Sequence, residues 1–348
     1  MSETDPLRTI VLGFGYWGVN QARNVAASPS TTLVGIVEPD ADRAALASAQ
    51  HPGARVVASV DELLGEAPEA AVICTPAASH RTVGIDLLRA GLHLLVEKPF
   101  AMTGGDARAL AEAGVAADRQ VVAGHTFLYS APVRRLRAMI DAGELGELRY
   151  LSFQRLSLGR IRADCNVLWN LAPHDVSIAL HLLGEPAIQA SASGFTFLQP
   201  GIADVVFGSL RFPSGAAAGL HLSWLDPRKT RTVTVVGTER MAVYDDVSTD
   251  RKIEVFDAGV VDPREGLGET STMAEWQWRT RAGDIVTKRL DLWEPLRQQI
   301  DEFAALIRSG TPVPTGTDHA IAVTDALEAL DASIAANGEP VAVRGATA

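Results

Sequence analysis

Cysteine is scarce in this chain of 348 residues, because only Cys74 and Cys165 are present. Two cysteines give no disulfide framework and no multi-cysteine metal site, and both suit a reducing compartment. Long apolar runs are also missing, since no stretch approaches the roughly 18 residues that a membrane-spanning helix needs. The polar, acidic N-terminus lacks the charged and apolar regions of a signal peptide. We therefore expect a cytoplasmic protein that does not insert into a membrane.

Basic residues are outnumbered, with Lys and Arg totalling 31 against 42 Asp and Glu, for a net charge of −11. They form no sustained run, which argues against binding to nucleic acid or to an anionic membrane surface. No cluster of His, Cys, Asp and Glu has convincing zinc spacing, so no metal is expected. The length and a hydrophobic content of 47% favour two domains that bind small molecules.

The first third of the chain alternates between short apolar runs and helical stretches. Strands are predicted over residues 9–12, 32–37, 55–58, 70–74, 92–97 and 120–123. This alternation is typical of an α/β protein with a doubly wound parallel sheet, the Rossmann arrangement. We assign residues 1–125 to this N-terminal domain.

Near Gly124 the pattern changes to longer strands of alternating polarity, including residues 148–156 and 204–212. Such strands at short spacing predict a large open sheet that is mostly antiparallel. Residues 126–348 are therefore predicted to form a second α/β domain. Its C-terminal helical stretches, 296–309 and 318–336, can pack back on the first domain.

A glycine-rich segment, Gly13-Phe14-Gly15-Tyr16-Trp17-Gly18, follows the first predicted strand and opens a helix. In such a motif the first glycine permits a tight turn, the second lets the backbone approach a pyrophosphate, and the third allows close helix packing. Glu38 ends the second strand, where a carboxylate can accept hydrogen bonds from the adenosine ribose and repel a 2′-phosphate. NAD is therefore favoured over NADP, although Arg43 leaves room for the latter. The alternatives are a plain glycine-rich turn, and for Glu38 a helix-start carboxylate.

The segment Glu97-Lys98-Pro99 ends the apolar run 93–96. It places an amine at the carboxyl end of a strand, which is the side of an open parallel sheet where ligands bind. The alternative for Lys98 is a strand-end lysine in a salt bridge with Glu97. Together with the glycine motif, the segment indicates a nicotinamide-dependent oxidoreductase with a lysine beside the path of hydride.

These motifs, with Ile73-Cys74-Thr75-Pro76 and the following His80, resemble the Gfo/Idh/MocA oxidoreductases over nearly the whole chain. The segments 124–129, 143–146 and 166–175 are similar to its sugar-nucleotide, UDP-N-acetylglucosamine 3-dehydrogenase-like members. The resemblance implies a Rossmann domain followed by a substrate-binding and oligomerisation domain, whose open sheet commonly supports homodimers or homotetramers. It also implies that Thr75, Pro76, His80 and Glu97 belong to the cofactor site.

The resemblance assigns Lys98 to the hydroxyl being oxidised and to the nicotinamide ribose. A family histidine maps onto His174, four residues after a position that is acidic in the family and is Asn170 here. This spacing puts the two side chains on one helix face. An amide can position a hydroxyl but cannot accept a proton, so His174 acts alone or with Asp175. The alternative for His174 is a capping or packing histidine after Pro173.

Five further residues are candidates for substrate contact. His125 follows the last strand of the first domain and is equally well explained as a structural histidine. Tyr129, Arg155, Arg160 and Arg162 can reach a sugar or phosphate. The forks of Arg160 and Arg162 suit phosphate oxygens, and a solvated loop explains these two arginines equally well.

The resemblance thus predicts an NAD-dependent dehydrogenase or ketoreductase acting on CH–OH groups. The expected reaction is oxidation of a secondary hydroxyl, at carbon 3, of a sugar or nucleotide-linked sugar. UDP-N-acetylglucosamine is the natural candidate, with inositol, a free sugar or a sugar on a natural product as rivals. The alternatives are a reductase of a non-sugar carbonyl or imine, and a non-catalytic NAD-binding regulator, since fold alone does not fix function.

Overall fold

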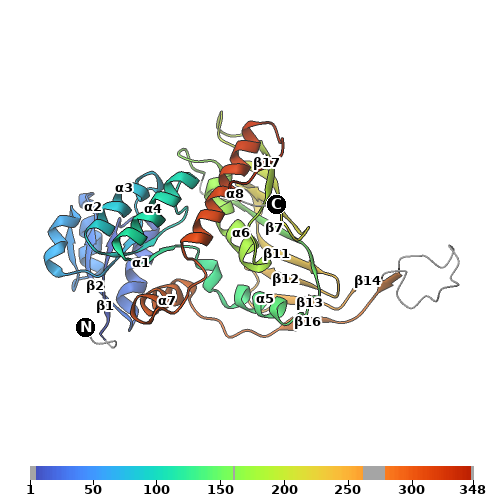
Figure 1. Ribbon diagram of the computed structural model, residues 1–348, viewed down its shortest axis with the longest axis horizontal. Coiled ribbons are helices and arrows are strands. Elements are labelled where there is room, and N and C mark those ends of the chain that lie inside the picture. Colours follow the sequence, from blue (N-terminus) through green and yellow to red (C-terminus); the bar gives the residue numbers. More distant parts are fainter. Residues whose placement is uncertain (1–4, 160, 262–278, 346–348) are drawn as a thin grey trace. The chain divides into compact units, whose positions relative to one another are not determined.

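The computed structural model describes residues 5–159, 161–261 and 279–345 (Figure 1). These residues form two compact units, each with its own core. Of the described residues, the first contains 5–130, 176–178 and 292–328, and the second contains 131–159, 161–175, 179–261, 279–291 and 329–345. The division of the chain by role, into a cofactor domain over 1–125 and a substrate domain over 126–348, stays a prediction.

The first unit is built on a sheet of six parallel strands in the order β3-β2-β1-β4-β5-β6. This is the strand order of the Rossmann fold, in which strands are added outward from β1 toward β3 and then, on the other side, from β4 toward β6. Because all six strands are parallel, their carboxyl ends lie at the same end of the sheet, called the carboxyl edge below. The strands are β1 (Leu7–Leu12), β2 (Thr31–Val37), β3 (Arg55–Val57), β4 (Ala70–Ile73), β5 (His93–Val96) and β6 (Val121–Ala123).

Both faces of this sheet are covered by apolar helix faces, because alternate strand residues point to opposite sides. One core contains Val11, Val25 and Phe303 from β1, α1 and α7, and the other contains Ile10, Leu87 and Leu110 from β1, α3 and α4. The helices are α1 (Tyr16–Ala27), α2 (Ala41–Gln50), α3 (His80–Arg89), α4 (Gly104–Ala117) and α7 (Pro295–Ser309), with short 3-10 turns η1 (Val60–Glu66), η2 (Ala77–Ser79) and η3 (Thr126–Tyr129).

The second unit contains a nine-stranded sheet in the order β16-β13-β12-β11-β7-β10-β9-β8-β17. Only the β7 and β10 pair is parallel among its described neighbours. Its strands are β7 (Leu148–Leu158), β8 (Gln189–Phe195), β9 (Val205–Arg211), β10 (Ala217–Ser223), β11 (Leu225–Gly237), β12 (Met241–Asp245), β13 (Ile253–Phe256), β16 (Ile285–Lys288) and β17 (Val341–Ala342), and β14 (Gly259–Val261) pairs separately with β15 (Arg279–Arg281).

One face of this large sheet packs against helices, and the other is open (Figure 1). The helices are α5 (Ala131–Asp141), α6 (Val167–Leu183) and the end of α8 (Thr317–Ala335). Phe207 and Phe195 project from the open face and are 48% and 44% exposed. Within the described residues, no helix combines the length and apolar character needed to cross a lipid bilayer. The cytoplasmic location stays a prediction.

The predicted fold class is confirmed, with a parallel Rossmann sheet followed by an α/β unit whose sheet is large and mostly antiparallel. The strands β8 and β16 were not among the predicted ones. Their sequences carry a weak apolar signal, because β8 reads QASASGF and β16 is only four residues long, with all but its last residue exposed.

Candidate functional site

The glycine segment forms the turn between β1 and α1. Gly13 has φ +87°, a left-handed conformation that other residues rarely adopt, and its N–H donates to Val37 O at 2.8 Å. A Cβ at Gly18 would lie 1.9 Å from Gly13 O, so only glycine lets helix α1 start this close to the strand. Two of the three glycines are therefore required by the protein's own packing.

Gly15 differs from its neighbours, because a Cβ added there meets nothing within 4 Å. Its φ of −78° is also open to other residues. Neither sterics nor backbone conformation thus requires glycine at this position, which directly precedes the first turn of α1. Helix N-termini bind phosphates through backbone N–H groups, and a side chain here would stand between them and a pyrophosphate. The open space at Gly15 and the N-terminus of α1 therefore suit the pyrophosphate of a dinucleotide.

The aromatic residues of the segment have different surroundings. Phe14 is buried and packs edge-on against His51, with ring centroids 5.9 Å apart. Tyr16 and Trp17 lie in the first turn of α1 and are 72% and 37% exposed. The structure therefore leaves Tyr16 and Trp17 accessible beside the turn, whereas the side chain of Phe14 belongs to the core.

Glu38 is buried at the carboxyl end of β2. It accepts hydrogen bonds from the Phe14 N–H at 2.7 Å, the Asp40 N–H at 3.0 Å and Arg43 Nη2 at 2.9 Å. Burial favours a higher pKa, but these hydrogen bonds outweigh it and hold the pKa of Glu38 below its ordinary value. Asp40, not Glu38, caps the following helix. A fixed carboxylate beside the glycine turn suits the ribose hydroxyls of NAD.

Glu97 and Lys98 follow β5 at the same edge of the sheet. Glu97 is buried, and its carboxylate accepts from Gln21 Nε2 at 2.7 Å and from the Lys98 N–H at 3.1 Å. Burial raises the pKa of Glu97. Its side chain thus ties helix α1 to the turn that carries Lys98, which is half-buried. Gln21 was not predicted, because no sequence motif pairs it with a residue 76 positions away.

Thr75, Pro76 and His80 follow β4, also at the carboxyl edge. The Thr75 hydroxyl accepts from Ser79 Oγ at 2.8 Å. His80 is buried, with Nε2 2.9 Å from Thr75 O and Nδ1 3.1 Å from Pro99 O. Both ring nitrogens of His80 therefore face backbone carbonyls of the protein itself, and the role predicted for this residue in the cofactor site stays a prediction.

His125 follows β6 and is buried with its ring edge-on to His319, the centroids 5.6 Å apart. Neither ring nitrogen has a hydrogen-bond partner among the described residues. Burial lowers the pKa of His125 well below its ordinary value, and the nearby His319 and Lys98 add to the shift. Burial thus favours the neutral form of His125, and Lys98 is one of the charges that act on it.

Tyr129 lies in the core of the first unit. Its hydroxyl pairs with Thr315 Oγ1 at 2.6 Å, and its carbonyl accepts from Trp293 Nε1 at 2.7 Å. The structure gives this hydroxyl a partner inside the protein, which sequence alone could not show because Thr315 lies 186 residues away.

Helix α6 carries the candidates of the second unit. Asn166 caps its start, Asn170 lies one turn later and His174 one turn beyond that. The Asn170 Oδ1 accepts from Trp224 Nε1 at 3.1 Å, and the Trp224 ring is almost fully buried. The predicted placement of Asn170 and His174 on one helix face follows from this α-helix.

Asp175 belongs to the buried side of α6. It forms a bidentate ion pair with Arg155 of β7, with Nε 3.0 Å and Nη2 2.6 Å from Oδ1. Both side chains are buried, at 8% and 3% exposure. Asp175 therefore ties the helix to the sheet, and this contact was not predicted.

The two candidate arginines lie after β7. Arg160 lies outside the described residues. Arg162 pairs with Asp164, with Nε 2.8 Å from Oδ1, and its side chain is 40% exposed.

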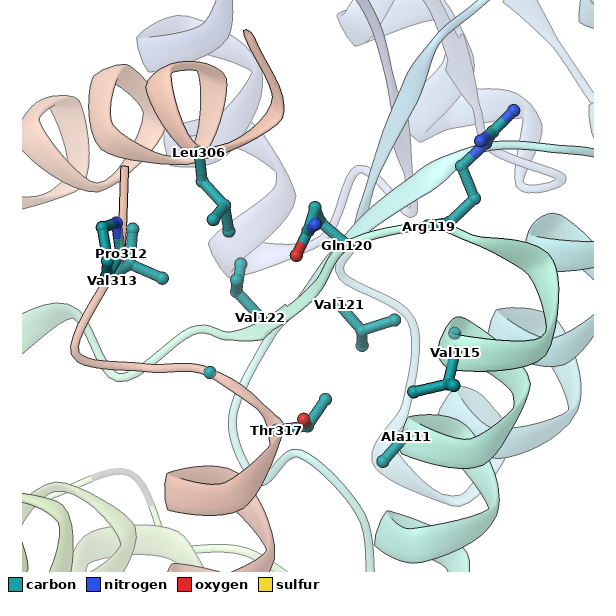
Figure 2. A pocket seen from close by; sticks show the side chains of 12 residues that line it. Ala111, Val115, Arg119, Gln120, Val121, Val122, Leu306, Pro312, Val313 and Thr317 are labelled. Atoms are coloured by element: carbon teal, nitrogen blue, oxygen red, sulfur yellow. The ribbon is translucent and has the colours of Figure 1, made fainter. Parts of the chain in front are cut away.

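A separate cavity of about 280 Å³ lies along the edge strand β6 (Figure 2). Val121 and Val122 of β6, Val115 of α4 and Leu306 of α7 line it, with Arg119 beside them. None of the predicted site residues lines this cavity. In the part of the chain that the structure describes, no three His, Cys, Asp or Glu residues are grouped to hold a metal ion.

Residues 7–125 match the model of the oxidoreductase family with an NAD-binding Rossmann fold, and residues 133–243 match the GFO/IDH/MocA C-terminal domain. UDP-N-acetylglucosamine 3-dehydrogenase of Acidithiobacillus ferrooxidans is 29% identical over 310 residues, which are 88% of this chain and 90% of that protein. Inositol 2-dehydrogenase of Leifsonia xyli is 38% identical over 191 residues, 53% of this chain and 56% of that protein.

Among solved structures, GenD2 from gentamicin A biosynthesis in complex with NAD superposes with a TM-score of 0.80. The match covers 99% of this chain and 98% of that one at 24% identity, so it concerns the fold. With the glycine turn and Glu38 in place, the cofactor is NAD. The chain belongs to the Gfo/Idh/MocA oxidoreductase family and is an NAD-dependent dehydrogenase or ketoreductase that acts on CH–OH groups.

Proposed function

We propose that the protein oxidises a secondary hydroxyl, at carbon 3, of a sugar or sugar nucleotide. The observation that carries this proposal is the position of Lys98 at the carboxyl end of β5, on the same sheet edge as the glycine turn and Glu38. Substrate identity is supported by the names of the two relatives, which act on a sugar nucleotide and on inositol. UDP-N-acetylglucosamine is the first candidate, with inositol and free sugars as rivals.

In the proposed reaction the alcohol loses a hydride and a proton and becomes a ketone. NAD, when bound, supplies the hydride acceptor. Lys98 donates a hydrogen bond to the hydroxyl and orients it, and its neighbour Glu97 fixes the turn through Gln21 and the Lys98 N–H. His174 takes the hydroxyl proton as general base in this proposal, a role that suits an imidazole near neutral pH.

The family resemblance implies an acidic residue one turn before His174, and this chain has Asn170 there. Its carbonyl oxygen is engaged by Trp224, which sets the orientation of the amide. An amide cannot take up a proton, so the proposal assigns Asn170 to hydroxyl positioning and proton transfer to His174. The predicted substrate contacts of His125, Tyr129, Arg160, Arg162 and Asp175 remain predictions.

We also propose that the open face of the large sheet forms a homodimer, which can pair further into a homotetramer. Phe207 is stacked on His221 with centroids 4.4 Å apart, and Phe195 packs edge-on against Phe207 at 6.1 Å. These exposed aromatic side chains support an interface with a second copy of the chain on this face, since large apolar patches mark association sites. Sedimentation velocity of Phe207→Asp should then show a smaller particle than that of the wild type.

The alternative within the same family is reduction of a non-sugar carbonyl or imine, for which the same residues would run the transfer in reverse. A non-catalytic NAD-binding regulator is the second alternative, and the observation favouring it is Asn170 in place of an acid. Substrate-independent binding of NAD without turnover would support the regulator.

The test is NAD reduction by the pure protein with UDP-N-acetylglucosamine, other UDP-sugars, myo-inositol and free sugars, with a carbonyl trap present. Reduction with at least one of them is expected, and Lys98→Met should lower kcat by about 10²- to 10⁴-fold. Lys98→Arg is the matched variant that keeps the charge. Silence across the panel in a protein that binds NADH would reject the proposal, and NADH oxidation with ketones or imines would identify the reductase.

A further inference from the structure

We infer that His80 is a positioning residue that joins the cofactor turn after β4 to the turn that carries Lys98. The inference rests on the proposed function for the role of Lys98. His80 is the first residue of helix α3 and is 1% exposed. Its imidazole therefore acts within the protein and not on a substrate.

The two contacts of the ring reach different turns. His80 Nε2 lies 2.9 Å from Thr75 O, and Nδ1 lies 3.1 Å from Pro99 O. Thr75 follows strand β4, whereas Pro99 comes directly after Lys98 at the end of β5. The ring of His80 thus lies between the two turns and contacts both.

The first of these turns packs on the glycine turn. A Cβ at Gly13 would lie 2.9 Å from Cys74 O and 3.3 Å from the Thr75 nitrogen, so the backbones are in close contact. A shift of Thr75 would therefore reach the backbone proposed to hold the pyrophosphate. A shift of Pro99 would move the adjacent Lys98.

Both acceptors are carbonyl oxygens, so the number of N–H groups on the ring decides how many of the two contacts are hydrogen bonds. A neutral imidazole has one N–H and can donate to only one of the two carbonyls, whereas an imidazolium donates to both. Burial lowers the pKa of His80, and the carbonyls of Thr75, Phe100 and Pro99 act in the opposite direction. Each nitrogen can be replaced separately by an amide donor.

The experiment compares His80→Asn with His80→Gln, because an asparagine amide occupies the place of Nδ1 and a glutamine amide that of Nε2. The Asn variant keeps a donor toward Pro99, and the Gln variant keeps one toward Thr75. Two readouts need no substrate. One is the NADH dissociation constant, and the other is the NMR signal of the Lys98 side chain, which is resolvable because the chain has four lysines, Lys98, Lys229, Lys252 and Lys288.

We expect His80→Asn to weaken NADH binding about 3- to 10-fold and to leave the Lys98 signal in place, whereas His80→Gln should do the reverse. A tenfold change corresponds to about 1.4 kcal/mol. Equal losses in both variants, together with equal falls in melting temperature, would show a merely structural histidine and overturn the inference. Unchanged values in both would also overturn it. A wild-type protein that turns over no sugar would reject the proposed function. The NADH dissociation constants and the Lys98 NMR signal of the two variants would still test the role of His80, because neither needs a substrate.

Discussion

The two units hold their polar side chains in different ways. In the first unit, each of Glu38, Glu97 and His80 bonds to backbone groups of the turns that follow the parallel strands, although Glu38 and Glu97 also accept from the side chains of Arg43 and Gln21. In the second unit, Asp175 and Asn170 of α6 are held by two side chains, Arg155 of β7 and Trp224 between β10 and β11. The first arrangement follows from where strands end, and the second depends on which distant residues meet.

The difference predicts different sensitivities to substitution. Turn backbones that are fixed by the sheet should tolerate the loss of one side chain but not a change of backbone shape. A helix that is fixed by side-chain pairs should respond strongly when one partner is removed. The following substitutions sharpen or break this contrast.

The largest effect is expected for Asp175→Asn, which leaves the Arg155 guanidinium buried without its carboxylate. Removing one partner of a buried ion pair costs about 3–5 kcal/mol of unfolding free energy. Urea unfolding followed by circular dichroism measures it. The matched control is Asp141→Asn, which breaks the more exposed pair with Arg137 and should cost less than about 1 kcal/mol. Equal losses in the two variants would contradict the contrast.

Gly18→Ala should be the most damaging change at the glycine turn, because its Cβ would lie 1.9 Å from Gly13 O and the backbone must shift. We expect a loss of about 1–3 kcal/mol, the range for overpacked sites. Thermal unfolding measures the loss. Gly53→Ala is the control in the same unit, since a Cβ there meets nothing within 4 Å. A Gly18→Ala protein as stable as this control would show that the turn is looser than the structure indicates.

Asn170→Ala should cost about 1–2 kcal/mol, because the buried Trp224 N–H would lose its acceptor. Asn170→Asp keeps an acceptor at the same place and should be nearly neutral. Urea unfolding of both variants checks this difference. If Ala and Asp are equally stable, the Trp224 contact does not fix the helix.

The smallest effect concerns pH. Burial and the nearby Arg119 lower the pKa of His93 from 6.5 to about 4, so the unfolded chain binds a proton that the folded chain does not. This stabilisation is complete above pH 6.5 and is lost as the pH falls toward 4. His93→Asn keeps an acceptor for the Gln120 N–H and does not titrate. When the pH falls from 7 to 5, the unfolding free energy of the wild type should drop by about 1 kcal/mol more than that of His93→Asn, after allowance for the partial exposure of His93. Parallel pH profiles of the two proteins would exclude this role.

The same contrast explains what the sequence could and could not predict. The glycine turn, Glu38 and Lys98 were predicted because local rules connect a motif to the strand before it. The pairings of Asp175 with Arg155 and of Gln21 with Glu97 were not, because they depend on how elements pack and not on spacing along the chain. For Tyr129, a plausible substrate contact from sequence, the structure places the hydroxyl against Thr315.

The most direct test of the account is the NADH affinity of Gly15→Ala. A Cβ at Gly15 meets nothing within 4 Å and φ there is −78°, so the substitution leaves the protein's own packing and backbone unstrained. We predict a melting temperature like that of the wild type and an NADH dissociation constant at least about tenfold higher, a loss of about 1.4 kcal/mol from the blocked pyrophosphate site. Unchanged affinity in an equally stable protein would contradict the placement of NAD at this turn.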